Sequence, residues 1–224
     1  MSKEIFIELR SAVYPPGDIS IAVNRGQDRV NQIESGLVHF FKHLNSSKFK
    51  GRTSIFFIDN TIGSQKELPA QILDILISNG VEILINNKND YGSKNKGAGD
   101  IDLWREHFNK INEFKWFLHF EPRTILQSPI FLEECLKSPR NLFKVFYPNE
   151  SPHHFYTGIF MIGTKELKHF IDSVNLDKMV KDKESIEYTF KNFMDEKYSD
   201  TYQDYTHKLN ILWHDAQQDR FIEF

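Results

Sequence analysis

The sequence has few of the features that mark secreted and membrane-spanning proteins. Its 224 residues include one cysteine, Cys135, which excludes an intrachain disulfide framework and favours a reducing compartment. No apolar run reaches the length of a membrane-spanning helix, and the first residues, MSKEIFIELR, lack the apolar core of a secretory signal. We therefore expect a cytoplasmic protein with no membrane span, while peripheral attachment to a membrane stays open.

An excess of charge of one sign is also missing. The net charge is -3, the isoelectric point is near 6.3, and lysines and arginines are scattered along the chain. A protein that binds duplex nucleic acid usually carries a basic patch or arm. We therefore expect no nucleic-acid partner, although a local basic pocket is compatible with this composition.

Apolar and aromatic residues are abundant. They make up 40% of the chain and include 20 Phe, 8 Tyr and 3 Trp, enough for a large core. The length suits one large domain, and no linker or internal repeat interrupts it. We expect a single domain over residues 1–224.

The first half of the chain alternates between two patterns. Short apolar runs predict strands at 18–23, 53–59, 81–85 and 115–121. Apolar residues at helical spacing predict helices at 28–44, 66–80 and 99–114. This order predicts an α/β fold with a mostly parallel central sheet and flanking helices.

The second half mixes its elements. We expect helices at 128–138, 165–174 and 183–198, strands at 141–148 and 155–164, and one more strand in the tail. The domain is thus expected to combine a ligand-binding α/β half, 18–122, with a mixed half, 123–224.

Polar residues follow each predicted strand of the first half. They include Asn24, Arg25, Asp59, Asn87, Glu121 and Arg123. Ligands of parallel sheets bind beyond the carboxyl ends of the strands. The longest such segment is rich in Asn and Gly: NNKNDYGSKNKGAGDIDLW at 86–104. It could be a plain connector, but a loop of this length between a strand and a helix is uncommon unless it is functional or disordered, and we expect a functional one. Its glycines and the following helix start suit an anionic group.

The order of these motifs resembles the GT-A fold glycosyltransferases. The segments that carry the resemblance are VNR, FIDN, NNKNDYGSKNKGAGDIDL, FKWFLHFEPR, TGIFMIGTKEL and ESIEYTF. The resemblance covers roughly residues 18 to 190 and depends on element order more than on any single motif. It implies transfer of a sugar from a nucleotide-diphosphate sugar to an acceptor hydroxyl on a glycan, a lipid-linked molecule or a small molecule.

The resemblance also implies roles for particular residues. The donor would be bound by Asn24, Arg25, Asp59, Asn87, Asn89, Gly97, Gly99 and Asp100. Glu121 and Arg123 would hold the diphosphate, and Glu187 would be the general base. From the residues alone, Asp59 is equally a turn former. Glu184 and Glu187, three residues apart on one helix face, are from the residues alone better explained as part of a solvated surface, and only the resemblance makes Glu187 a candidate base.

One motif departs from the family. GT-A enzymes usually carry Asp-x-Asp after the fourth strand, where it binds a divalent metal, whereas this chain has Glu121-Pro122-Arg123. Glu121, with His214 from the tail, would hold Mn²⁺ or Mg²⁺ if a metal is used. An arginine can also neutralise a diphosphate directly through paired hydrogen bonds.

Two other readings stay open. The chain could be another nucleotide-binding transferase, such as a nucleotidyltransferase, or a non-catalytic binding module that has kept the fold and lost the metal motif. The sequence does not define the sugar, the base, the stereochemistry or the oligomeric state.

Overall fold

The structure is a computed structural model that describes residues 3–15, 26–86, 88–147, 152–215 and 220–223, with backbone alone from residue 213. Seven described strands form one sheet in the order β3-β2-β1-β4-β7-β6-β8. Their bounds are β1 Ile5–Ser11, β2 Thr53–Asp59, β3 Glu82–Ile85, β4 Trp116–Phe120, β6 Asn141–Phe146, β7 His154–Gly163 and β8 Tyr202–Asp204. Strands β3, β2, β1 and β4 run parallel, β7 is antiparallel to β4 and β6, and β8 is parallel to β6.

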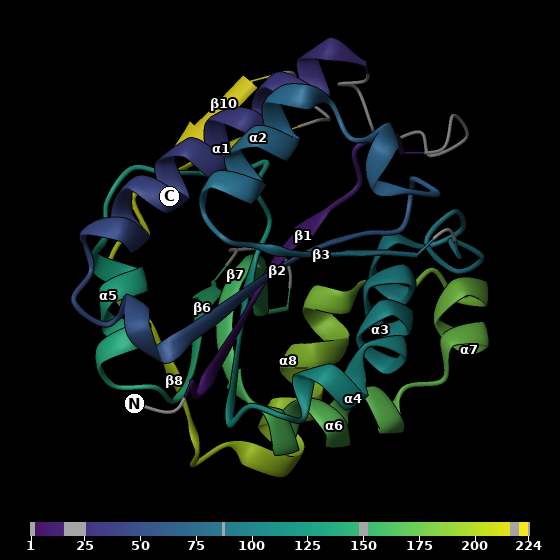
Figure 1. The fold of residues 1–224 in the computed structure, drawn as a ribbon. Coiled ribbons are helices and arrows are strands. Elements are labelled where there is room, and N and C mark those ends of the chain that lie inside the picture. The colour runs from purple at the N-terminus through teal and green to yellow at the C-terminus, as the bar shows by residue number, and fades with distance from the viewer. Residues whose placement is uncertain (1–2, 16–25, 87, 148–151, 216–219, 224) are drawn as a thin grey trace.

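Helices cover both faces of this sheet (Figure 1). On one face lie α1 Gln27–Ser46, α2 Ala70–Ser78 and α5 Ile130–Lys137, together with a small sheet of β5 Ile125–Leu126, β9 Ile211–Asp215 and β10 Arg220–Glu223. On the other face lie α3 Lys96–Glu106, α4 Phe108–Ile111, α6 Thr164–Ser173, α7 Leu176–Lys181 and α8 Ile186–Tyr198. Short 3-10 turns occur at Lys50–Arg52 and Gln65–Glu67. Each face encloses its own apolar core.

The apolar spacing explains both layers. In α1 the buried side chains recur at three- and four-residue intervals and form one stripe, made of Val30, Ile33, Leu37, Phe40 and Leu44. In β1 every residue is buried, as expected of a strand covered on both faces. Burial on both faces also accounts for the apolar runs of β2 and β4.

Most predicted elements are confirmed within a few residues. The strands at 53–59, 81–85 and 115–121 are β2, β3 and β4, and the helix at 28–44 is α1. The helix at 66–80 is shorter than predicted, because α2 begins only after Pro69. The helix at 99–114 is divided at His107 into α3 and α4, while α7 and β8 were not predicted.

The first strand is the main difference. The predicted strand at 18–23 lies outside the described residues, and β1, an interior strand of the sheet, lies at Ile5–Ser11, where no strand was predicted. Glu8 and Arg10 interrupt its apolar run, although both are buried. The ligand-binding half of the fold therefore includes β1, which lies between β2 and β4.

This strand order determines where a ligand site is expected. The chain proceeds from β1 through β2 to β3 on one side, and β4 then adds on the opposite side of β1. The carboxyl ends of strands around such a reversal form the usual crevice of open α/β sheets. Among the described residues, no helix is both long and apolar enough to cross a lipid bilayer.

Candidate active site

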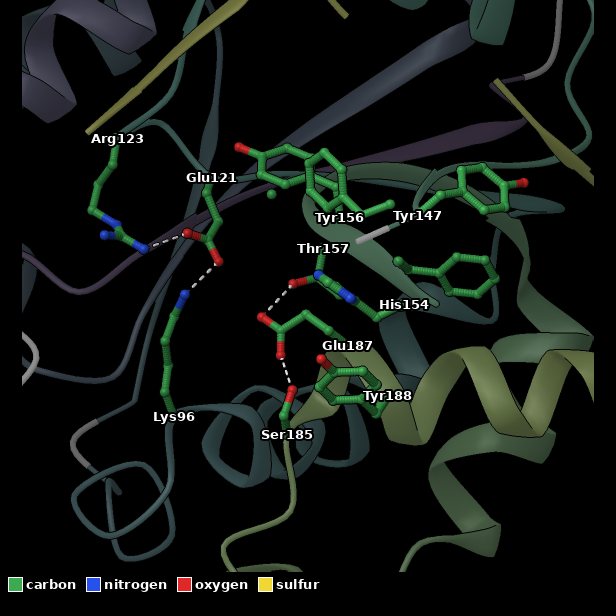
Figure 2. A pocket seen from close by; sticks show the side chains of 13 residues that line it. Lys96, Glu121, Arg123, Tyr147, His154, Tyr156, Thr157, Ser185, Glu187 and Tyr188 are labelled. Atoms are coloured by element: carbon green, nitrogen blue, oxygen red, sulfur yellow. Dashed lines mark hydrogen bonds and ion pairs between the residues drawn. The ribbon is translucent and has the colours of Figure 1, made fainter. Parts of the chain in front are cut away.

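An ionic cluster lies just beyond the carboxyl end of β4. Glu121 Oε1 accepts a hydrogen bond from Lys96 Nζ at 2.7 Å, and Glu121 Oε2 accepts one from Arg123 Nη2 at 2.6 Å (Figure 2). Glu121 follows β4, and Lys96 is the first residue of α3. The carboxylate thus joins a helix start to the turn after the strand.

The electrostatics of this cluster keep Glu121 ionised. Burial by itself would raise its pKa, but the charges of Lys96, Arg123 and His119 outweigh burial and hold the pKa of Glu121 well below its usual value. The Glu121 side chain is only 8% exposed, whereas the Lys96 side chain is 56% exposed. The buried Glu121 carboxylate therefore holds the Lys96 and Arg123 side chains, which lie nearer to the solvent than it does.

The turn that carries Arg123 is held from the opposite face of the sheet. A Cβ atom on Gly36 of α1 would lie 1.7 Å from the Pro122 carbonyl oxygen and 2.8 Å from that of Thr124. Only glycine permits this approach of helix and turn. The backbone N–H of Glu121 also donates to the Gly158 carbonyl of β7 at 2.9 Å. The position of the Glu121 turn is therefore set by packing as well as by charge.

Glu187 faces the same cavity from another element. It lies in the first turn of α8, and its carboxylate accepts hydrogen bonds from Ser185 Oγ and, at 3.3 Å, from Thr157 Oγ1. The cavity has a volume of about 530 Å³, and Lys96, Glu121, Arg123 and Glu187 all line it (Figure 2). The three residues predicted as catalytic thus lie around one cavity, although α8 is distant from β4 in the sequence.

Two predicted donor-binding carboxylates lie deeper in the structure. Asp59 is fully buried and accepts from the backbone N–H of Val13 at 2.8 Å and of Thr61 at 2.7 Å. Asp100 accepts from Arg10 Nε at 2.9 Å, and burial raises the pKa of Asp100 although Arg10 opposes this shift. Both carboxylates hold backbone and side chains in place here, and their contact with a donor stays a prediction.

The Asn- and Gly-rich loop is ordered by its own packing. A Cβ atom on Gly99 would lie 2.4 Å from the Gly92 Cα atom, and one on Gly97 would lie 2.6 Å from Ile186 Cβ. The Asn95 side chain caps α3 by accepting from the Ala98 N–H at 3.0 Å. The glycines therefore bring loop and helices together, and the phosphate approach expected of them stays a prediction.

The remaining predicted residues are partly outside the described chain. Asn24, Arg25 and Asn87 lie outside the described residues, as does the side chain of His214. Asn89 accepts from Asn60 Nδ2 at 2.8 Å, at the carboxyl end of β2. It thus lies at the predicted edge of the sheet.

Lys96 and Arg10 were not predicted. Lys96 belongs to a segment with several lysines, and no sequence pattern separates it from Lys94. Only the fold brings it to Glu121, which is 25 positions away. Arg10 gave a usable signal, since a charged residue within an apolar run is costly to bury without a partner. It pairs with Asp100 and with Asn60 Oδ1 at 3.1 Å.

A divalent metal does not fit the described part of this cluster. Among the residues whose side chains are described, no three His, Cys, Asp or Glu residues gather as metal ligands. Both oxygens of Glu121 already bind cationic groups, which a metal ion would have to displace against its own charge. The reaction proposed for this site therefore uses no metal, and ligation of a metal by Glu121 and His214 stays a prediction.

Comparisons with known proteins identify the fold. No protein-family model and no curated sequence matches the chain. A protein assigned as a nucleotide-diphospho-sugar transferase of Desulfovibrio desulfuricans G20 superposes with a TM-score of 0.53 at 8% identity, over 88% of this chain and 77% of that one. A Bacillus anthracis protein assigned as a glucose-1-phosphate thymidylyltransferase gives 0.51 at 12% identity, over 96% of this chain and 92% of that one.

At these identities the likeness establishes the fold alone. The chain has the mostly parallel α/β sheet seen in nucleotide-diphospho-sugar transferases. The predicted fold class is confirmed, whereas the GT-A glycosyltransferase resemblance is supported only at this broader level.

Proposed function

We propose that this chain is a glycosyltransferase that moves a sugar from a nucleotide-diphosphate sugar to an acceptor hydroxyl. The observation that carries the proposal is one cavity lined by Lys96 and Arg123, which both pair with Glu121, and by Glu187 (Figure 2). Such a transfer needs positive charge for the leaving diphosphate and a base for the attacking hydroxyl. The cavity presents both kinds of group on separate elements.

The cationic side suits the diphosphate. Glu121 fixes Lys96 and Arg123 at 2.7 Å and 2.6 Å, so that their remaining N–H groups are oriented before a ligand arrives. The arginine fork offers paired hydrogen bonds to phosphate oxygens, and the lysine adds a compact charge. In this role Glu121 positions the donor by holding the two cations.

The opposite side suits the acceptor. Ser185 and Thr157 donate to the Glu187 carboxylate and hold it toward the cavity. The acceptor oxygen forms its bond to the anomeric carbon, its proton passes to Glu187, and the nucleoside diphosphate leaves with the electron pair of the broken bond. A base in this position belongs to an inverting reaction.

Nucleotidyl transfer is the second candidate, since a thymidylyltransferase is among the matching folds. Lys96 and Arg123 would serve that reaction as well, because it also develops charge on phosphate oxygens. The segment between β1 and α1, residues 12–26, contains no lysine for a triphosphate. The products separate the candidates: glycosyl transfer releases nucleoside diphosphate, and nucleotidyl transfer releases pyrophosphate. A non-catalytic module would bind nucleotide and release neither.

The test begins with thermal unfolding in the presence of UDP, GDP, CDP and dTDP, each with EDTA and with Mn²⁺. We expect one nucleotide to raise the unfolding midpoint in EDTA. Charge-assisted hydrogen bonds contribute about 1.5–3 kcal/mol, so Lys96→Ala or Arg123→Ala should weaken binding by roughly ten- to hundred-fold.

Lys94→Ala is the matched control, because Lys94 is an exposed lysine two positions before Lys96. It should leave the nucleotide shift unchanged. If no nucleotide raises the midpoint under either condition, the proposed function is wrong.

A further inference from the structure

The cavity has a second, aromatic side that the chemistry above does not use. Beyond Glu187, on the side away from Glu121, its lining includes Tyr147, His154 and Tyr188 (Figure 2). We call these three side chains, together with Phe146, the aromatic wall. They come from the end of β6, the start of β7 and the first turn of α8.

Tyr147 is exposed and yet held in place. Its residue is 59% exposed. Its hydroxyl donates to Asp204 Oδ2 at 2.8 Å, a bond that raises the pKa of Tyr147 to about 12. Asp204 Oδ1 in turn accepts from the Val145 N–H at 2.9 Å, so a strand backbone supports the tether. The ring is thus fixed while remaining open to solvent.

The other rings support one another. The ring centroids of Tyr188 and His154 are 4.9 Å apart, and those of His154 and Phe146 are 5.5 Å apart. Tilted pairs at these separations are favourable contacts between aromatic rings. Phe146, His154 and Tyr188 therefore form a connected row of rings, and Tyr147 is held by Asp204. These side chains are preorganised before any ligand binds, which lowers the entropic cost of binding.

We propose that the aromatic wall binds the pyranose ring of a carbohydrate acceptor, and this inference rests on the proposed function. Flat aromatic faces pack against the C–H face of a pyranose, while tyrosine and histidine edges can bond its hydroxyl groups. A lipid chain would favour aliphatic side chains instead. Glu187 lies between the wall and the ionic cluster, so a ring on the wall brings a hydroxyl group to the base (Figure 2).

The experiment uses the full chain and saturation-transfer NMR. Methyl glycosides of glucose, galactose, mannose and N-acetylglucosamine are titrated, with the nucleotide that raises the unfolding midpoint present throughout. We expect one glycoside to receive saturation from the aromatic protons of the protein on one face of its ring. A stacked aromatic contact corresponds to about three- to ten-fold in affinity, so Tyr188→Ala and Tyr147→Ala should each weaken that glycoside by this factor.

Two further variants are controls that distinguish loss of the aromatic contact from misfolding. Tyr188→Phe keeps the ring and should keep most of the glycoside affinity. Tyr198→Ala, on the same helix but packed against Phe193 and His169, should leave the affinity unchanged. Thermal unfolding confirms that each variant is folded.

The outcomes separate the two ideas. The inference is overturned if no glycoside receives saturation, or if the glycoside affinity is unchanged in both alanine variants. It is also overturned if those variants lose nucleotide affinity instead, because the wall would then bind the nucleobase of the donor. If no nucleotide raises the unfolding midpoint of the unmodified protein, the proposed function is wrong. The glycoside titration is then repeated without nucleotide, and it tests whether the aromatic wall binds a carbohydrate.

Discussion

Replacing Glu121 by glutamine should destabilise the protein at neutral pH. The substitution keeps the shape of the side chain and removes the negative charge between Lys96 and Arg123. Each charge-assisted hydrogen bond contributes about 1.5–3 kcal/mol. The glutamine oxygen can keep one bond to Arg123, while Lys96, whose side chain is 56% exposed, can turn to water. We therefore expect a loss of about 2–4 kcal/mol in the free energy of unfolding.

The size of this loss should depend on pH. The pKa of Glu121 in the folded protein lies well below its usual value of 4.5. Its contribution is therefore complete above about pH 4.5, where the unfolded chain is ionised too, and is lost as the pH falls toward the folded pKa. The glutamine variant has no such group, so the two unfolding free energies should converge in acid.

Urea unfolding between about pH 7 and about pH 3 measures both effects. Glu134→Gln is the control, because Glu134 forms a more exposed pair with Arg140, and such pairs contribute at most about 1 kcal/mol. A difference between Glu121→Gln and the unmodified protein that stays below about 0.5 kcal/mol, or that is equal at every pH, would refute this account of the ionic cluster.

Three other predictions follow from named contacts. Gly36→Ala should cost at least about 1–3 kcal/mol of unfolding free energy, because its Cβ would lie 1.7 Å from the Pro122 oxygen, whereas Gly51→Ala, with no atom within 4 Å, should be neutral in urea unfolding. Glu187→Gln should lower kcat by about 10²–10⁴-fold with little change in nucleotide affinity, and an unchanged kcat in a product-release assay would remove Glu187 as the base. Cys135 is fully buried and its pKa is raised by burial, so it should react with iodoacetamide only after unfolding; rapid labelling of the native protein, followed by mass spectrometry, would contradict its placement.

The sequence predicted some strands of the sheet and missed others. Strands β2 and β4 were predictable because they are buried on both faces and read as continuous apolar runs. Strand β1 was not, because Glu8 and Arg10 are buried with partners that lie far away in the chain: His119 Nδ1 lies 2.5 Å from Glu8 Oε2, and Asp100 pairs with Arg10. Buried charges look like surface residues until their partners are known.

Some site residues could likewise be predicted from the sequence, and others could not. Glu121 was predictable as a site residue because a carboxylate that follows an apolar strand must be paired or functional. Its second cation, Lys96, was not predictable, since nothing local distinguishes it from neighbouring lysines. The sequence marked the loop glycines as special, and the structure adds one reason that the sequence did not give: Gly97 and Gly99 pack closely against Ile186 and Gly92.

The sequence by itself determined the α/β class, most of the strands and helices, and Glu121 and Arg123 as candidates, because local periodicity and polar groups at strand ends depend on neighbouring positions. Glu187 became a candidate only through the resemblance to a known family. Only the tertiary structure decided that β1 lies inside the sheet between β2 and β4 and that Lys96 and Arg123 share the Glu121 carboxylate. It also decided that Glu187 lines the same cavity, with an aromatic wall beside it. The physical reason is that these contacts join segments far apart in the chain, and the order in which strands pair and helices pack brings them together.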